Sequence, residues 1–408
     1  MNPKRPRVVV VGGSLGGLTA GLVLRDAGCD VTIYERSSAA LEGRGAGIVL
    51  HPQSERYLVE NGLAPLETFS TAATTLRYLD PDGAVLHESA CGYRFTAWNT
   101  LYKSMLHEME RKRYLLGRQV TSVDPAQRSA RVGFAGGGVE VADLVVCADG
   151  ISSTGRAQLL PQCRPVYAGY VGWRGTVPEW ELSTASAGQV GGTINYHLMP
   201  GSHILTYPIP GLDGSVEVGR RLVNFVWYRN VEAGPALDGL MTDRLGTHRE
   251  ISVPPGAVQE MYVDELREVA ENLPPPIREV VRATREPFIQ PIADVEVPTM
   301  TFGRVCLVGD AAFVARPHAA AGTAKAAADA WALREALVGA GWDFEAALHV
   351  WERRQLVLGA ALLERVRRMG DAAQFGTGWR PGDPNLRFGL ERPGDSEERG
   401  DMKCAPPV

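Results

Sequence analysis

The stretch that decides the fold runs from Val8 to Gly17 and reads V-V-V-V-G-G-S-L-G-G. Its consecutive valines predict a buried strand, and its glycines predict a tight turn that enters a helix over Leu18 to Asp26. A second apolar run, Val31 to Tyr34, predicts the next strand and ends at Glu35. A strand, a glycine-rich turn, a helix and a second strand in this order indicate the βαβ unit of a Rossmann-like fold.

The glycine-rich turn has the spacing of a dinucleotide-binding site. In such a turn the backbone comes close to a pyrophosphate, and the N–H groups and dipole of the helix N-terminus favour its negative charge. Glu35 lies 23 positions after Gly12, close to the place where an acidic residue binds ribose hydroxyls. Ser14 replaces the middle glycine of the usual pattern. The turn therefore predicts a dinucleotide site with one departure.

The same residues support a rival interpretation. Gly12 to Gly16 also reads G-x-S-x-G, the nucleophile elbow of α/β-hydrolases, with Ser14 as the nucleophile. In that fold several strands precede the elbow, whereas only one can precede it here. No Asp and His partners stand out at later loops, and Glu35 would have no role. The hydrolase is therefore the less favoured alternative.

Two later segments each end a buried apolar strand with an aspartate. Ala142 to Arg156 reads A-D-L-V-V-C-A-D-G-I-S-S-T-G-R, and Pro298 to Asp329 contains V-C-L-V-G-D followed by a proline-interrupted loop and an alanine-rich helix. Either segment alone could be an ordinary strand and turn with polar surface residues. Together with the glycine-rich turn, they predict one shared cofactor site.

The order of these segments resembles that of the flavin-dependent aromatic hydroxylases, the single-component FAD monooxygenases. The match covers nearly the whole chain, with A-D-G-x-x-S-x-x-R from Ala148 to Arg156 and G-D-A-A with P-x-x-x-x-G from Gly309 to Gly322. Three further runs resemble the members that act on hydroxypyridines: W-R-G at Trp173 to Gly175, Y-P-I-P-G at Tyr207 to Gly211, and R-P-H-A-A-A-G at Arg316 to Gly322.

The resemblance implies which residues contact FAD. Asp310, just past a strand end, could accept hydrogen bonds from the ribityl hydroxyls. The full set implied is Gly12, Ser14, Leu15, Gly17, Glu35, Arg36, Gly47, Val120, Asp149, Gly150, Arg156, Gly309, Asp310, Pro317, Gly322 and Thr323.

The resemblance also implies an α/β architecture, α+β overall, in which a Rossmann-like FAD-binding domain and a mixed β-sheet substrate domain interleave before C-terminal helices. We expect the FAD-binding domain over 1–70, 98–165 and 286–370, and the sheet domain over 71–97 and 166–285. Alternating aromatic, β-branched and polar residues from Pro165 to Arg229 indicate such a half-buried sheet. The Gly-, Pro- and charge-rich residues 371–408 are expected to form a tail that lies over the surface or is disordered.

In the resembled family, a C4a-hydroperoxyflavin inserts one oxygen atom of O2 into an electron-rich aromatic ring, and NADH or NADPH is a transient co-substrate. A hydroxypyridine is the expected substrate. A phenolic acid, or the pyridine of a natural-product tailoring reaction, is the alternative on the same fold. A redox-silent FAD-binding interaction protein is an alternative of another class, and it would lack aromatic residues in a cavity.

Such chemistry requires a water-poor cavity and a group that holds or removes the ring proton. His318 lies on the loop expected to face the flavin, and His203 and Tyr207 are evenly spaced on one strand, so they share a face. We expect these three residues to be catalytic, and Tyr207, Trp227, His318 and Arg174 to contact substrate. Each could instead be ordinary: a histidine at a helix start, a sheet residue or a solvated arginine. The eight histidines show no ligand spacing, so no metal is expected.

Global composition fits an enzyme that acts on small molecules. The 408 residues are 45% hydrophobic and carry a net charge of −5, which does not favour nucleic acid. No apolar run reaches the roughly 18–20 residues that span a bilayer. Six cysteines without C-x-x-C spacing favour a reducing cytoplasm. A homodimer is an open expectation.

Overall fold

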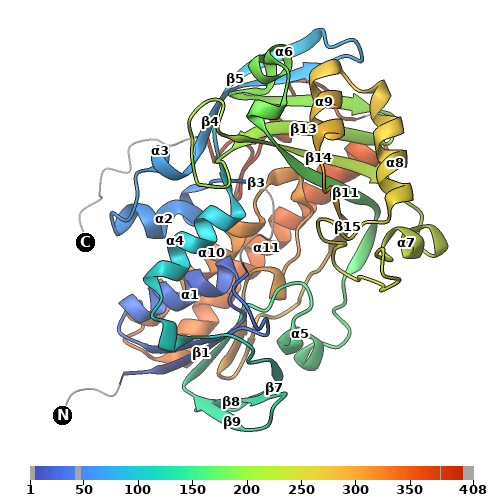
Figure 1. Ribbon diagram of the computed structural model, residues 1–408. Coiled ribbons are helices and arrows are strands. Elements are labelled where there is room, and N and C mark those ends of the chain that lie inside the picture. The colour runs from blue at the N-terminus through green and yellow to red at the C-terminus, as the bar shows by residue number, and fades with distance from the viewer. Residues whose placement is uncertain (1–4, 42–46, 377, 398–408) are drawn as a thin grey trace.

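The computed structural model describes residues 5–41, 47–376 and 378–397. Its first sheet, in the lower half of Figure 1, has the strand order β16-β17-β10-β1-β2-β6. The strands are parallel except for β16, which is antiparallel to β17. Their bounds are β1 (Arg7–Val11), β2 (Asp30–Tyr34), β6 (Tyr114–Leu115), β10 (Leu144–Cys147), β16 (Thr301–Phe302) and β17 (Val305–Leu307).

Both faces of the first sheet are covered, which explains why its central strands read as continuous apolar runs. Helices α1 (Leu15–Asp26) and α10 (Gly322–Gly339) pack together on one face. A three-stranded sheet of β7 (Val120–Pro125), β8 (Ala130–Phe134) and β9 (Val139–Ala142) contacts the other side. All residues of β10 and β17 are buried. The βαβ prediction is therefore confirmed.

The second sheet has the order β15-β11-β14-β13-β12-β4-β5-β3 and is antiparallel except between β12 and β4. It fills the upper half of Figure 1. Its strands are β3 (Gly47–Val49), β4 (Thr71–Leu79), β5 (Val85–Ala97), β11 (Val166–Pro178), β12 (Thr193–Met199), β13 (Ser202–Ile209), β14 (Leu222–Asn230) and β15 (Phe288–Asp294).

The two faces of the second sheet carry different residues. One face, the outer face, packs against α6 (Thr184–Val190), α8 (Glu260–Val269) and α9 (Pro275–Ala283) through a cluster rich in valine and tryptophan. The opposite face, the inner face, carries a second cluster rich in tyrosine. Because side chains alternate along a strand, each position is assigned to one face by its parity.

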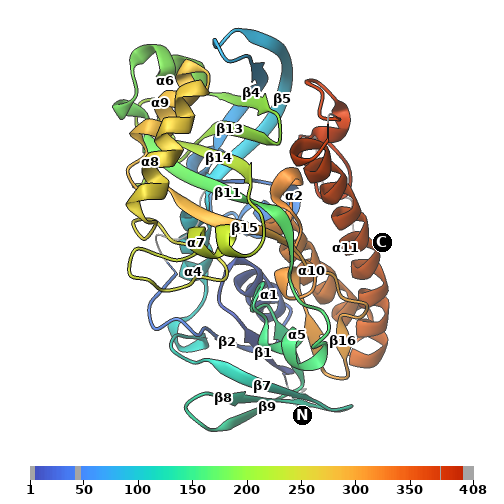
Figure 2. The same ribbon diagram turned by 90° about the vertical axis from the view of Figure 1, so that its right-hand side faces the viewer.

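Helix α11 (Phe344–Gln374) connects the two sheets. It extends along one side of the molecule and contacts β16 of the first sheet and β13 and β14 of the second (Figure 2). The other α-helices are α2 (Pro52–Glu60), α3 (Leu66–Phe69), α4 (Trp98–Glu108), α5 (Thr154–Leu159) and α7 (Pro235–Leu240). The 3₁₀ helices are η1 (Arg111–Arg113), η2 (Glu179–Glu181), η3 (Ala270–Asn272), η4 (Gly309–Ala311), η5 (Pro317–Ala319) and η6 (Pro384–Leu386). Within the described ranges, no helix is long and apolar enough to cross a membrane.

The boundaries between the two parts differ from those expected. β3 and β15 fall in segments assigned to the FAD-binding domain, yet both belong to the second sheet. Strand β15 pairs with β11 from Val166↔Asp294 to Arg174↔Phe288. The chain therefore returns to the first sheet only after Asp294. The sequence pattern does not show to which sheet β3 and β15 belong. Both are edge strands, and an edge strand pairs through backbone N–H and C=O groups, which every residue type except proline supplies in full.

The end of the chain also differs from the expected tail. Residues 378–397 pack on the inner face of the second sheet, and residues 398–408 lie outside the described part. Phe388 is buried, with its ring 4.9 Å from Tyr93 and 6.5 Å from Phe95. Arg365 of α11 donates a hydrogen bond to the Gly389 carbonyl. This segment therefore forms part of the core that covers the inner face.

Replacing Phe388 tests that packing. Phe388→Ala should lower the free energy of unfolding by about 3–5 kcal/mol, because it removes a buried aromatic ring and leaves a cavity. Leu212→Ala is the control, since Leu212 is 83% exposed and should change stability by at most about 0.5 kcal/mol. Urea unfolding followed by tryptophan fluorescence measures both. Equal midpoints for the two variants would show that the segment does not pack in solution.

Candidate functional site

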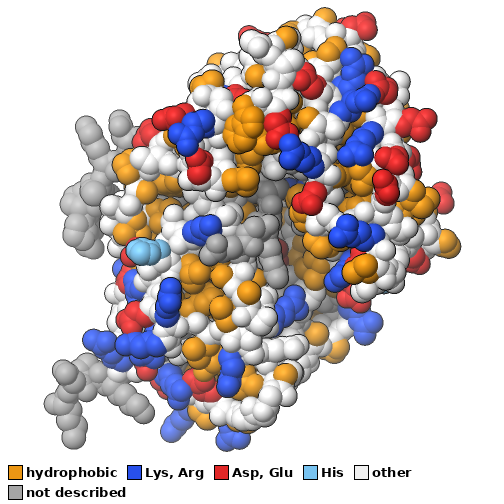
Figure 3. All heavy atoms as spheres, in the orientation of Figure 1, with side chains coloured by type: hydrophobic (Ala, Val, Ile, Leu, Met, Phe, Trp, Pro, Cys, Tyr) orange, Lys and Arg blue, Asp and Glu red, His pale blue; other side chains and the backbone are white. Residues whose placement is uncertain are grey.

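Four strand ends bring the predicted cofactor residues to one edge of the first sheet. Gly12 follows β1, Glu35 follows β2, Asp149 follows β10 and Asp310 follows β17. Parallel strands end on the same side, so these turns meet there. A cavity of about 430 Å³ opens at the turns after β1, β2 and β10, on a face hollowed between the parts that carry α4 and α7 (Figure 3). Of the predicted residues, those that line it are Gly12, Ser14, Glu35, Arg36, Val120, Asp149 and Gly150.

The glycines of the turn are required by space. Gly12 has φ +97°, and a Cβ there would lie 2.5 Å from the Ala148 carbonyl oxygen. A Cβ on Gly17 would lie 1.9 Å from the Gly12 carbonyl oxygen. Ser14 precedes α1, but its side chain caps no N–H of that helix. The turn therefore presents a serine hydroxyl and an uncapped helix N-terminus to the cavity.

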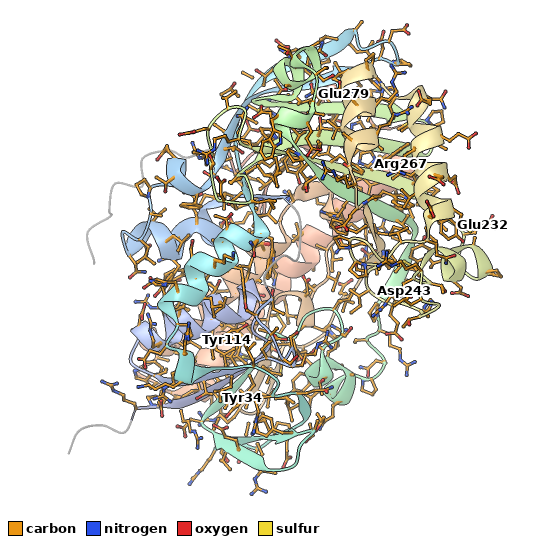
Figure 4. The ribbon with its side chains drawn as sticks, viewed as in Figure 1. Tyr34, Tyr114, Glu232, Asp243, Arg267 and Glu279 are labelled. Atoms are coloured by element: carbon orange, nitrogen blue, oxygen red, sulfur yellow. The ribbon has the colours of Figure 1, made fainter. Side chains whose placement is uncertain are left out.

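Glu35 and two tyrosines hold the turn in place. The Glu35 carboxylate accepts hydrogen bonds from the N–H groups of Gly13 (2.9 Å) and Ser37 (2.8 Å). Tyr114, which Figure 4 shows beside α1, donates to the Gly13 carbonyl oxygen at 2.8 Å. The Tyr102 hydroxyl lies 3.0 Å from that of Tyr114. These contacts fix the backbone that would face a phosphate.

Arg156 binds the backbone of the loops around the site. Its guanidinium donates to the carbonyl oxygens of Asp310 and Ala311 at 3.1 Å each, and to those of Cys163 and Ile151. The side chain is buried, and each of its three nitrogens is used in this way. The guanidinium therefore supports the Asp310 loop, and Arg156 does not line the cavity; its contact with FAD stays a prediction.

Asp149 and Asp310 remain available to a ligand. One carboxylate oxygen of Asp149 accepts from the Thr154 N–H at 2.7 Å, while the other is buried without a partner. The Asp310 side chain is reached by solvent, and no hydrogen bond to it is found among the described residues. Protein atoms nevertheless surround it, and this desolvation raises the pKa of Asp310 to about 6 against the pull of Lys325 and Arg156.

The loop that carries Asp310 rests on a buried ion pair. Lys325 donates to both carboxylate oxygens of Asp329, at 2.6 and 2.8 Å, and both side chains are almost fully buried. Asp329 also accepts from the Gly309 N–H at 2.8 Å. Helix α10 begins at Gly322 without a side-chain cap. The backbone N–H groups of its first turn, including that of Thr323, are therefore free, and they lie just after the Pro317 loop.

The predicted catalytic histidines lie together on the inner face. His203 of β13 stacks on Tyr228 (4.6 Å between ring centroids) and Trp379 (5.1 Å), and His318 lies 5.4 Å from it. We name Tyr170, His203, Tyr228, His318 and Trp379 the aromatic cluster. Burial lowers the pKa of His203 to about 3, and burial with repulsion from His203 and Arg316 lowers that of His318 well below its usual value. Both rings are therefore neutral at physiological pH.

Tyr207 shares the inner face with His203, as predicted from their spacing. Its ring stacks on Phe95 at 4.2 Å, and its hydroxyl donates to the Gly47 carbonyl oxygen at 3.0 Å. Asn224 accepts from the Gly47 N–H at 3.2 Å. Burial raises the pKa of the Tyr207 phenol. The hydroxyl therefore holds β3 against the sheet, which makes it a poor candidate for the catalytic base.

Trp227 and Arg174, both predicted to contact substrate, lie on opposite faces of the second sheet. Trp227 lies on the outer face, in the cluster with Trp173, and its indole N–H donates to Ser202 at 2.9 Å. Strand parity explains this position, because Trp227 is one residue from the inner-face position Tyr228. Arg174 has inner-face parity on β11, pairs with Val226, and carries a buried Nε without a partner. Its charge acts on the hydroxyls of Tyr207 and Tyr228.

Next to Arg174 the inner face borders a second cavity of about 550 Å³. Its walls include Thr176, Ile209, Leu222 and Phe288 from the second sheet. Trp98, at the start of α4, lines both this cavity and the one at the first sheet. The two cavities therefore share Trp98 as part of their walls. No group of three or more His, Cys, Asp or Glu residues within the described ranges could hold a metal ion.

Comparisons with known proteins fit these features. A family profile described as FAD binding domain matches residues 5–197, and one described as FAD binding domain-like matches residues 167–294. The chain is 37% identical to the 2,6-dihydroxypyridine 3-monooxygenase of Paenarthrobacter nicotinovorans, over 96% of this chain and 98% of that protein. The chain belongs to the FAD-dependent aromatic hydroxylases. Its fold class and its FAD cofactor are thereby confirmed, and the hydrolase interpretation of Ser14 is wrong.

Two further relatives extend the comparison. The solved structure of 2,6-dihydroxypyridine-3-hydroxylase from Arthrobacter nicotinovorans has a TM-score of 0.91 and 37% identity, and covers 96% of this chain and 98% of that one. The 3-amino-4-hydroxybenzoate 2-monooxygenase of Streptomyces cremeus is 27% identical over 90% of this chain and 87% of that protein. As a monooxygenase, this enzyme uses O2 and reducing equivalents from NADH or NADPH.

Sequence analysis missed several residues around the aromatic cluster. Tyr170 and Tyr228 lie at inner-face positions, and strand parity from His203 through the register of β13 and β14 could have found Tyr228. Two further residues, Gln374 and Trp379, lie near the C-terminal end of the described chain. Gln374 donates a hydrogen bond to His203 Nδ1 at 2.8 Å. Their composition gave no signal, because a stretch rich in Gly, Pro and charge resembles a disordered tail.

Asp310 is the sharpest test of the FAD site. Asp310→Ala should keep the fold and weaken FAD binding by about 1–3 kcal/mol, because ribityl hydroxyls would lose their acceptor. The flavin-to-protein absorbance ratio after dialysis measures the loss, and circular dichroism checks the fold. Asp310→Asn, which keeps an acceptor oxygen, should lose less FAD. Full flavin content in Asp310→Ala would remove this residue from the site.

The raised pKa of Asp310 gives a pH prediction. In the FAD-free protein the carboxyl becomes protonated as the pH falls through about 6. Protonation removes the charged acceptor, so FAD affinity of the wild-type protein should fall below that pH and stay constant above it. Asp310→Asn has no group to titrate there and should show a flat profile from pH 5 to 8. Flavin fluorescence titrations measure both, and parallel profiles would contradict the assignment.

Proposed function

We propose that this FAD-dependent monooxygenase hydroxylates a hydroxypyridine bound along the inner face of the second sheet, between Arg174 and His318. The observation that carries the proposal is Arg174, a partly buried cation for which no ion pair is found among the described residues. An electron-rich hydroxypyridine reacts most readily with its hydroxyl ionised, and an unpaired guanidinium favours that anion. The name of the Paenarthrobacter relative supports the same substrate class.

The residues around Arg174 suit a planar aromatic ring. Ile209, Leu222 and Phe288 line the adjoining cavity and exclude water, which strengthens any electrostatic contact inside it. Unpaired polar atoms on the same face are Arg174 Nε, Asn224 Nδ2 and His318 Nδ1. A ring that carries hydroxyl groups and a ring nitrogen offers partners for such atoms, whereas a hydrocarbon ring does not.

FAD fits the other side of this space. The turn at Gly12 and Ser14 would bind the pyrophosphate, Glu35 the adenosine ribose, and Asp310 the ribityl chain, while Pro317 and Gly322 would border the ring system. When bound and reduced, FAD supplies an activated oxygen atom from O2 to the substrate. The protein residues position the aromatic ring, hold its ionised oxygen and keep water out.

A phenolic acid is the second candidate, because Arg174 could bind a carboxylate as well as a ring oxyanion. The Streptomyces cremeus relative is named for such a substrate. A pyridine in natural-product tailoring would use the same contacts. Action in the cytoplasm and assembly as a homodimer are further proposals. The five described cysteines are free thiols, which suits a reducing compartment, and sedimentation velocity would measure the assembly.

Substrate-stimulated oxidation of NADH separates the two substrate classes. In the enzyme with FAD bound, 2,6-dihydroxypyridine and monohydroxypyridines should accelerate NADH oxidation and yield hydroxylated product, because they fit as anions at Arg174. Salicylate and 4-hydroxybenzoate should stimulate little. Product is measured by chromatography and peroxide by a coupled assay. Stimulation by phenolic acids alone would overturn the substrate class and leave the enzyme class intact.

Arg174→Gln tests the cation directly. A hydrogen bond to a charged group contributes about 1.5–3 kcal/mol, so the dissociation constant of the stimulating aromatic should rise roughly 10–150-fold. Arg220→Gln is the matched control, because Arg220 is an exposed arginine already paired with Asp213 and Glu217. Substrate-induced changes in the flavin absorbance measure affinity. Unchanged affinity in Arg174→Gln would place the anion elsewhere.

A further inference from the structure

Gly370, inside α11, marks a point where three polar groups converge. A Cβ on this residue would lie 2.5 Å from the Tyr170 hydroxyl oxygen, 2.9 Å from His318 Nε2 and 3.1 Å from Arg316 Nη1. Glycine within a helix is less stable than alanine by about 1 kcal/mol. At this position any side chain would displace the converging groups, so the geometry requires glycine.

Arg316 is held by carboxylates on two sides. Its Nε and Nη2 donate to Asp294 at 3.0–3.2 Å, and its Nη1 donates to Asp371 at 2.6 Å. The Arg316 guanidinium also lies close to Tyr170, 5.9 Å from the centre of its ring. Its positive charge opposes the rise that burial causes in the pKa of Tyr170. A nearby cation favours the lone pairs of a hydroxyl oxygen over its proton, so the lone pairs of Tyr170 face Arg316.

The orientation of the Tyr170 hydroxyl decides which nitrogen of His318 carries the proton. The Tyr170 hydroxyl lies 2.7 Å from His318 Nε2. Because the lone pairs of the Tyr170 oxygen face Arg316, its single proton points to Nε2, which must then be the acceptor. In a neutral imidazole the proton then sits on Nδ1. Nδ1 is buried and has no hydrogen-bond partner in the described structure.

We propose that Arg316, Tyr170 and Gly370 lock His318 as a neutral Nδ1–H donor, which binds the ionised oxygen of the aromatic substrate. Tyr170 and Gly370 are positioning residues, and His318 is the group that touches the substrate. The inference deepens the proposed function and rests on it. It replaces the general base expected from sequence, because the bond from Tyr170 occupies the nitrogen that would have to accept a proton.

Replacing His318 separates a donor from a base. The amide of His318→Asn offers an N–H near the place of Nδ1, whereas His318→Leu fills the volume without a donor. A donor role predicts that Asn keeps hydroxylation within about 10-fold of wild type and that Leu loses roughly 10–100-fold in substrate affinity. A base role predicts that both lose roughly 10²–10⁴-fold in rate. Equal losses of activity and substrate affinity in the two variants would contradict the proposed donor role of His318.

Gly370→Ala and Tyr170→Phe test the positioning residues. Both should keep FAD and raise the pH at which bound substrate ionises, seen in its absorbance spectrum, because Nδ1–H is no longer fixed. Gly339→Ala is the control, since a Cβ on that glycine of α10 meets nothing within 4 Å. Coupled groups give non-additive effects, so the double variant should resemble either single one. An unchanged substrate spectrum in Tyr170→Phe would sink the inference, even if Gly370→Ala fails to fold.

The controls also separate this inference from the proposed function. The same measurements use whichever aromatic stimulates the wild-type enzyme. If only a phenolic acid does so, the hydroxypyridine proposal fails, and the lock is judged with that compound. If a hydroxypyridine stimulates the wild type and His318→Leu binds it equally well, the proposed function stands and the lock fails.

Discussion

The cofactor side of the molecule depends on the bonds that Arg156 makes to backbone carbonyls. Strands β10 and β17 are neighbours, so the loops that carry Asp149 and Asp310 leave the same edge of the first sheet. A buried guanidinium that donates to Asp310 and Ala311 fixes the separation of these loops. Buried carbonyl oxygens without a donor are costly, so the loops and the arginine require each other. The edge of the sheet thereby becomes a preformed site.

The loop that carries His318 is held by β15 and α11. His318 belongs to a loop that follows the first sheet, but Arg316 ties this loop to Asp294 of β15 and to Asp371 of α11. Arg367 of α11 adds a second cation to Asp294. Removing one member of a buried ion pair leaves its partner uncompensated, at a cost of about 3–5 kcal/mol. The loop therefore moves with the second sheet and α11, which keeps His318 in register with His203.

The parts of the fold and site that sequence predicted are those set by local chemistry. Val8 to Glu35 combines a strand, a glycine turn and a helix, and each element has its own signal within a few residues. The inner-face pair His203 and Tyr207 follows from strand parity alone. The role of Arg156 was not predictable, because its partners are backbone carbonyls of distant loops. Trp379 was missed because its ring contacts are with residues distant in the sequence, such as His203, and the residues beside it in the sequence do not indicate them.

The inner face of the second sheet carries an uncompensated positive charge, which favours binding of an anion. Burial keeps His203 and His318 neutral and raises the pKa of the tyrosine phenols, so none of these groups is ionised at neutral pH. Asp294 and Asp371 compensate Arg316. Among the described inner-face residues this leaves Arg174 as the cation without a counter-charge.

An isolated cation in a poorly solvated space raises the free energy of the empty site and lowers that of a bound anion. A neutral aromatic of the same shape would leave Arg174 uncompensated and would lose that contribution. The site would therefore distinguish an anionic from a neutral aromatic by charge more than by shape, because the apolar walls would contact both rings equally. Hydroxypyridines and phenolic acids both satisfy this requirement. What separates them is where the negative charge sits relative to Arg174 and to the Nδ1–H of His318.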